Sequence, residues 1–124
     1  MSIDLLGQVA AEGMGTRQSA KAPAVQVIMS RWPSWPRGAN PFWPSPPRWA
    51  WAPDGAPKSR IVPTFPPATI VTTPRSDVQY VVTEYGVVNL KPLTTRDRAR
   101  ALIDLAHPDC RGMLTAEAKK LGLL

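Results

Sequence analysis

The chain has 124 residues, enough for one small domain, and its net charge of +6 and pI near 10.1 invite a nucleic-acid partner. Most of the excess charge lies in residues 19–58, which carry five Lys or Arg and one acidic residue, so the rest of the chain is nearly balanced and nucleic acid is the less favoured partner. The single cysteine, Cys110, excludes an internal disulfide, and no apolar run approaches the ~18 residues of a membrane helix. The N-terminus lacks the pattern of a signal peptide, so we expect a cytoplasmic protein with no membrane partner.

Residues 1–18 predict a strand followed by a turn and a loop. An apolar run from Ile3 to Val9 is interrupted by Gly7-Gln8, and Glu12 to Arg17 continues as a glycine-containing loop. Because the sequence starts almost at this strand, with no preceding element to pair with it, we expect a truncated domain.

Residues 19–58 show neither a helical nor a strand period. All five tryptophans lie within 20 residues, eight of the 15 prolines lie between positions 33 and 57, and residues 32–36 nearly repeat as residues 43–47. Three interpretations stay open at this point. The segment is a polyproline-type binding element, a product of faulty translation, or a strip for nucleic acid in which tryptophans stack on bases while Arg31, Arg37 and Arg48 contact phosphates.

Residues 59–92 are strand-like. Ile61-Val62 leads into Phe65-Pro66-Pro67, which we expect to be a turn or extended loop because proline removes donors from a strand ladder. Ala68 to Thr73 is a strand candidate, and a turn follows at residues 74–77. Val78 to Tyr85 is the strongest strand candidate because both of its faces are largely apolar. Gly86 is expected to end it, with Val87 to Leu90 pairing onward.

Residues 94–106 give the clearest helix signal. Thr94 is the expected N-cap, with Asp97 three residues later. His107-Pro108 is expected to stop this helix, and a second helix is expected from Thr115 to Leu121, before Gly122. One face of the first helix is apolar through Ala99, Leu102, Ile103 and Ala106, and we expect the other face to be solvated through Arg96, Arg98, Arg100 and Asp104.

Four runs of residues, read together, resemble one protein family. Residues 59–63, 72–78, 81–87 and 106–109 are similar, in order and spacing, to the C-terminal domain of the acetyl-CoA hydrolase/transferase family, which includes acetate, succinate and 4-hydroxybutyrate CoA-transferases. Residues 4–9 and 15–18 resemble the family's segment just upstream, while Cys110 stands where an aromatic residue is usual. The resemblance implies an α/β fold: a partial CoA-transferase-type domain with short strands, two C-terminal helices and an irregular Pro/Trp-rich segment.

The same resemblance implies the chemistry of the parent enzymes. Their reaction moves CoA from an acyl-CoA to a short carboxylic acid, or hydrolyses the thioester, through a glutamyl-CoA intermediate stabilised by backbone N–H groups of a glycine loop. CoA is then a substrate, no cofactor is bound covalently, no metal is needed, and an oligomer is compatible with the family. The glutamate of the family lies upstream, and no residue here matches its motif. We therefore assign no catalytic residue, leave CoA-binding residues unassigned and expect the chain alone to be inactive. Glu84 is expected to have a structural role, with support of the site as the alternative, and His107 a role in capping or packing.

The family's glycine loop is missing from the sequence as translated. A Gly-Gly-x-Ser/Gly-Asp-aromatic loop and a Leu-Ala-Leu-Pro strand belong where this chain has residues 19–58. If each codon takes the last base of its predecessor, residues 42–46 can be spelled apolar-Leu-Ala-Leu-Pro, and residues 23–30 can be spelled as the glycine loop. We interpret residues 19–58 as out-of-frame translation between two intact parts, 1–18 and 59–124. The alternative function is a small basic Pro/Trp-rich module that binds nucleic acid or a proline-recognition partner.

Overall fold

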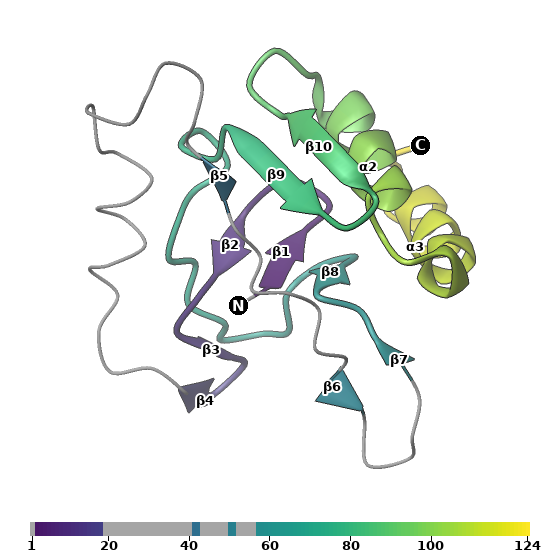
Figure 1. The fold of residues 1–124 in the computed structure, drawn as a ribbon. Coiled ribbons are helices and arrows are strands. Elements are labelled where there is room, and N and C mark those ends of the chain that lie inside the picture. The colour runs from purple at the N-terminus through teal and green to yellow at the C-terminus, as the bar shows by residue number, and fades with distance from the viewer. Residues whose placement is uncertain (1, 19–40, 43–49, 52–56) are drawn as a thin grey trace.

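The computed structural model describes residues 2–18, 41–42, 50–51 and 57–124 (Figure 1). Short strands precede two helices at the C-terminal end of the chain, so the predicted fold class is confirmed. Among the described residues, no helix is both long and apolar enough to cross a membrane. The strands are β1 (Ser2–Asp4), β2 (Val9–Ala10), β3 (Gly13–Met14), β4 (Arg17–Gln18), β5 (Pro41–Phe42), β6 (Ala50–Trp51), β7 (Pro57–Lys58), β8 (Ile61–Val62), β9 (Tyr80–Thr83) and β10 (Gly86–Asn89).

The N-terminal strand and turn form as predicted. Strand β1 lies between β2, to which it is antiparallel, and β8, to which it is parallel. The carboxylate of Asp4 accepts hydrogen bonds from the backbone N–H groups of Leu6 (3.1 Å) and Gln8 (2.8 Å). Gly7 has a φ of +88°, a conformation that favours glycine, and its N–H bonds the Asp4 carbonyl at 3.0 Å. The sequence predicts a turn where Gly7-Gln8 interrupts the apolar run, and Asp4 accepts the hydrogen bonds that close it.

The strongest predicted strand is the first half of a hairpin. Strand β9 pairs antiparallel with β10 in a register that places Gly86 opposite Thr83 and Asn89 opposite Tyr80. The onward pairing of residues 87–90 is thus with the preceding strand, and Glu84 and Tyr85 form the turn. On its other side β9 is parallel to β5, giving the sheet order β10-β9-β5.

The strand predicted from Ala68 to Thr73 is wrong. Ala68 has a φ of +64°, and the N–H of Thr69 donates to the carbonyl of Pro66 at 3.2 Å. A proline at the second position and a positive φ at the third define a type II turn, which an alternating pattern cannot reveal. Of residues 68–73, all of them described, Thr73 alone makes a strand-like bridge, to Val9.

Both predicted helices exist, and one boundary is wrong. Helix α2 (Thr95–Asp104) starts as predicted, with the Thr94 side chain accepting from the N–H of Asp97. Helix α3 (Pro108–Lys120) begins seven residues earlier than expected. Pro108 does prevent α2 from continuing, but it also starts α3, because a proline in the first turn has no N–H to leave unsatisfied and its φ is already helical.

The solvated face expected on α2 is correct for three of its four charged residues. Arg96, Arg100 and Asp104 are exposed. Arg98 instead donates from Nε to the Leu93 carbonyl (3.2 Å) and from Nη1 to the Arg75 carbonyl (2.8 Å). This arginine ties the start of α2 to the loop that precedes β9.

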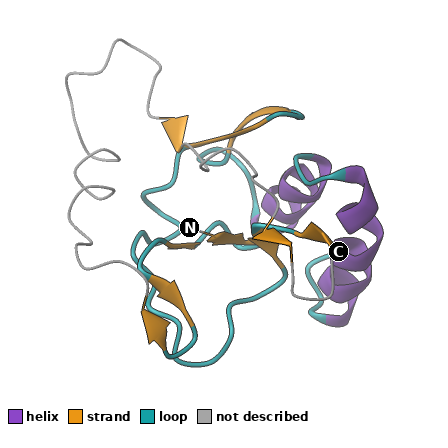
Figure 2. Ribbon diagram, turned by 60° about the horizontal axis from the view of Figure 1, so that its bottom comes forward, coloured by secondary structure: helices purple, strands orange, loops and turns teal. Residues whose placement is uncertain are grey.

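The core lies where the helices meet the strands. In Figures 1 and 2 the two helices lie together at the β10 side of the strands, away from β3 and β4. Leu5, Leu90, Leu102 and Leu114 are completely buried. The same cluster includes Ile3, Val9, Ile61, Val78, Val81, Ala99, Ile103, Leu105, Ala106, Cys110 and Ala118. The resulting domain therefore joins residues from both sides of the 19–58 segment.

Only three pairs of residues from the Pro/Trp-rich segment are described. They are strands: β5 pairs with β9, and β6 pairs antiparallel with β7. The remainder of residues 19–58, including the tryptophan and arginine positions that suggested a nucleic-acid strip apart from Trp51, lies outside the described residues. The expected irregularity of this segment stays a prediction.

Candidate functional site

Two of the sequence runs that carry the family resemblance meet in space. Residues 83–86 form the turn of the β9–β10 hairpin, and residues 106–109 form the junction between α2 and α3. We call these two segments together the motif junction. It contains both residues singled out from the sequence, Glu84 and His107, and places them on different elements.

The hydroxyl of Thr83 holds the junction together. Its Oγ1 donates to the carbonyl of Leu105, the C-cap of α2, at 2.9 Å, and accepts from the N–H of Tyr85 at 3.1 Å. One side chain thus fixes the hairpin turn and satisfies a carbonyl at a helix end. Gly86 follows with a φ of +148°, and a Cβ added there would lie 3.4 Å from Cδ2 of Leu105. A side chain at position 86 would therefore strain the backbone and press on the end of α2.

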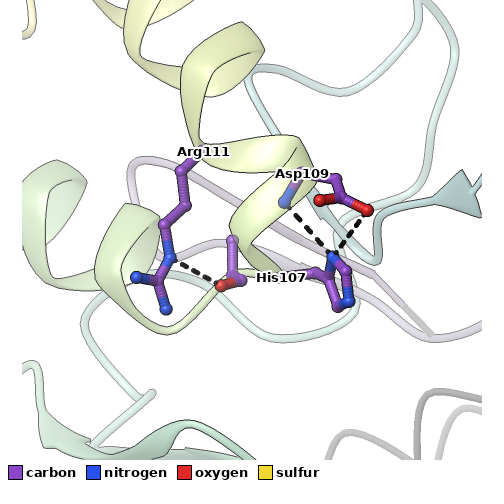
Figure 3. Close-up of polar contacts among 4 residues, drawn as sticks. His107, Asp109 and Arg111 are labelled. Carbon is purple, nitrogen blue, oxygen red and sulfur yellow. Dashed lines mark hydrogen bonds and ion pairs between the residues drawn. The ribbon is translucent and has the colours of Figure 1, made fainter.

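His107 caps α3, which confirms the capping role expected for it. Its Nδ1 accepts from the backbone N–H of Asp109 at 3.3 Å and lies 3.5 Å from Oδ2 of the same residue (Figure 3). The carboxylate of Asp109 also lies in the first turn of α3, where the positive end of the helix dipole favours a negative charge.

Tyr85, inside the motif junction, and Arg111, two residues beyond it, make further contacts there, and sequence reasoning gave neither residue a role. The Tyr85 ring meets the His107 ring edge-to-face, with centroids 5.6 Å apart, and the Arg111 guanidinium lies 5.6 Å from the Tyr85 centroid. Arg111 also donates from Nε to the Ala106 carbonyl at 2.9 Å. Partial desolvation, reinforced by the nearby charge of Glu84, raises the pKa of Tyr85. The sequence signal for these two residues was their position alone. Tyr85 lies within the run 81–87, and Arg111 follows the run 106–109 by two residues.

Glu84 and Cys110 differ sharply in their surroundings. Glu84 is exposed in the hairpin turn, open to solvent. Cys110 is buried in the core, where desolvation, together with the charge of Asp109, raises the pKa of the thiol. Burial of this kind suppresses the reactive thiolate, so Cys110 acts as a small apolar side chain in the core.

Asp4 is the most deeply buried carboxylate among the described residues. Besides two backbone N–H groups, it accepts from Nε2 of Gln8 at 2.7 Å. Desolvation outweighs these hydrogen bonds and raises the pKa of Asp4 above its ordinary value. Its partners all lie within its own turn, so its role is to shape the chain between β1 and β2. Within the described ranges, no group of three or more His, Cys, Asp or Glu side chains is placed to hold a metal ion.

The fold and the motif junction define a partial α/β domain of the CoA-transferase type. The family model for the acetyl-CoA hydrolase/transferase C-terminal domain matches residues 1–118, and the chain belongs to that family. It is 40% identical, over 121 residues, to the succinyl-CoA:cyclohexane-1-carboxylate CoA transferase of Geobacter metallireducens, covering 98% of this chain and 26% of that protein. It is 41% identical to the 4-hydroxybutyrate coenzyme A transferase of Clostridium kluyveri, covering 97% of this chain and 27% of that protein.

Solved structures agree with this assignment. RipA from Yersinia pestis superimposes with a TM-score of 0.68 at 36% identity, and a mutant form of RipA superimposes with a TM-score of 0.73 at 37% identity. Each match covers 99% of this chain and 26% of the RipA chain. The chain therefore spans about a quarter of the length of the relatives it matches.

Proposed function

We propose that this chain is the C-terminal domain of a cytoplasmic enzyme that transfers CoA from an acyl-CoA to a short carboxylic acid. The names of the relatives support this reaction, since both proteins compared above are CoA transferases, which favours transfer over hydrolysis. The reaction would run through a glutamyl-CoA thioester, with CoA as a substrate. No catalytic residue is assigned to this chain, so we propose that it does not catalyse the reaction alone.

The family match itself carries the further proposal that residues 19–58 are out of frame. The match extends from residue 1 to residue 118, so parts of one family domain lie on both sides of this segment. A reading frame that is displaced and later restored replaces side chains and keeps the chain length, which is compatible with the family's order on both sides of the segment. Hydrogen bonds between the flanking parts support this reading, because Ile3 donates to Arg60 (3.0 Å) and Val9 to Thr73 (3.0 Å).

The genetic code restricts what the displaced frame can spell. Tryptophan has the single codon TGG, and phenylalanine codons end in T or C. Reading each codon with the last base of its predecessor therefore gives leucine at position 43 and alanine at position 44, whatever codons are used. Position 42 becomes NTT, which is always apolar. Position 42 lies in β5, the parallel neighbour of β9, and apolar residues are typical of parallel strands.

The nucleotide sequence of the gene is the first test. We expect the displaced frame to be open from position 19 to position 58 and to spell a glycine loop before the Leu-Ala stretch. A stop codon in that frame, or a frame without the glycine loop, refutes the displacement.

A pair of chimeras tests the function. The C-terminal quarter of the C. kluyveri transferase is replaced by this chain as translated, or by the same chain with residues 19–58 respelled in the displaced frame. We expect CoA transfer to return only in the respelled chimera, followed as acyl-CoA exchange by chromatography, with the intact transferase as the positive control. Equal activity of the two chimeras would contradict the displacement, and a soluble, folded but inactive respelled chimera would contradict the proposed function.

The chain alone provides a separate measurement. Mixed with butyryl-CoA and acetate, it should give no transfer above a buffer blank, and enzyme-like turnover would overturn the proposed inactivity. The Pro/Trp-rich module stays a prediction that no contact of the described residues favours. Salt-dependent binding to single-stranded DNA would support it instead.

A further inference from the structure

One ring nitrogen in the motif junction has two contacts that require opposite protonation states. Nδ1 of His107 accepts the backbone N–H of Asp109 at 3.3 Å, which requires a free lone pair on the nitrogen. The same Nδ1 lies 3.5 Å from Oδ2 of Asp109, and a hydrogen bond in that direction requires a proton on the nitrogen. Figure 3 shows both contacts converging on the one atom. The two hydrogen bonds therefore cannot exist together.

The surroundings of His107 allow its ring to exchange protons with solvent. The His107 side chain is 27% exposed and that of Asp109 is 70% exposed. Among the described residues, Tyr85 of the hairpin turn meets the His107 ring edge-to-face, and the charges of Glu84, Asp109 and Arg111 act on Tyr85. Arg111 is held by the Ala106 carbonyl and faces Tyr85, while the Asp109 carboxylate is a negatively charged group in contact with Nδ1.

We propose that His107 is a proton switch for the first turn of α3. When the ring is neutral, Nδ1 caps the helix by accepting the Asp109 N–H. When the ring takes up a proton, Nδ1 becomes a donor to the Asp109 carboxylate, and the Asp109 N–H loses its acceptor. A histidine ring can carry a proton or not in the neutral pH range, which makes the exchange accessible to measurement in buffered solution. The inference concerns only the α2–α3 junction and does not depend on CoA chemistry.

The helix itself supplies an internal reference. The N–H of Cys110 donates to the backbone carbonyl of His107 at 2.9 Å, a bond that the ring proton does not enter. Acidification should therefore expose the amide of Asp109 and leave that of Cys110 protected. Loss of an N-cap bond corresponds to about a fivefold change in the opening equilibrium.

Amide exchange measured by ¹⁵N NMR on the full 124-residue chain tests the switch. After correction for the intrinsic pH dependence of exchange, the Asp109 amide should exchange about fivefold faster at about pH 5 than at about pH 8, and the Cys110 amide should change less than about twofold. The midpoint for Asp109 should coincide with the midpoint of the His107 ring signals. A ring that titrates while the Asp109 amide stays constant would overturn the proposal.

The variant His107→Asn provides the control. Asparagine is among the best N-caps and accepts a hydrogen bond at any pH, so the Asp109 amide should become independent of pH in this range. If the pH dependence persists in His107→Asn, the ring is not its source and the switch is wrong. If the variant fails to fold, the comparison of the two midpoints in the parent chain still decides the matter.

Discussion

The type II turn at residues 66–69 gives the sharpest prediction for stability. Its third residue, Ala68, has a φ of +64° and is exposed, so its side chain gains no packing that could offset the strain. A residue with a Cβ in the left-handed region costs about 1–2 kcal/mol. We expect Ala68→Gly to remove that cost.

The net gain is smaller than the strain because glycine also frees the unfolded chain. That entropic loss is about 0.4–1 kcal/mol, which leaves a gain of about 0–1.6 kcal/mol, centred on about 0.8 kcal/mol, in the free energy of unfolding. For a chain of this size the central value corresponds to a rise in Tm of about 2–5 °C. In urea the midpoint should rise while the m-value stays the same, because the surface exposed on unfolding does not change.

The same substitution in a helix provides a matched control. Ala116 is exposed within α3, where glycine lowers stability by about 1 kcal/mol relative to alanine. Ala68→Gly and Ala116→Gly should therefore shift the urea midpoint in opposite directions. A loss of stability in both variants would show that the positive φ at Ala68 carries no strain, and the reasoning about this turn would be refuted.

Three further measurements address other contacts. Thr94→Ala should lower the free energy of unfolding by about 1 kcal/mol and reduce the helical circular dichroism signal, whereas Thr94→Ser should match the parent chain. Thr83→Val removes the bonds to Leu105 and Tyr85 and should cost about 1–2 kcal/mol in urea unfolding, with Thr83→Ser as the control; an unchanged midpoint would mean that the hydroxyl does not hold the junction. Burial raises the folded-state pKa of Asp4. The contribution of Asp4 to the free energy of unfolding is therefore complete below the unfolded-state pKa and is lost as pH rises through the folded-state pKa. The stability of the parent relative to Asp4→Asn should fall from about pH 3 upward. Parallel pH profiles of these two proteins would contradict that sign.

The sequence correctly predicted those elements that have their capping or turn residue at their own end. Thr94 and Asp97 mark the start of α2, and the N–H of Asp97 does bond the Thr94 side chain. Gly7 marks the first turn and adopts the positive φ that makes glycine necessary there. In these cases the residue that stabilises the element is also the residue that identifies it.

Sequence reasoning missed features for which the usual signal residue is absent, and features for which one residue has two structural roles. Glycine at position 68 would have indicated the type II turn. The chain has alanine there, so the pattern of residues 68–73 indicates a strand instead. Pro108 ends one helix and begins the next, and the sequence pattern revealed only its first role. The contact between Tyr85 and His107 joins residues that are distant in the sequence, and no local period encodes such a contact.

The role of the family-like residues in the structure explains why the chain can be assigned to its family from the sequence. Thr72 accepts from the N–H of Ala11 through Oγ1 at 2.9 Å, and Thr69 accepts from Gly15 at 2.7 Å, so residues 69–73 bind the part of the chain that precedes position 19. The motif junction likewise joins a hairpin to two helices through Thr83 and His107. These residues are needed to assemble the domain and therefore identify its fold. The same bonds join the two parts of the chain on either side of residues 19–58, so these two parts hold each other in place.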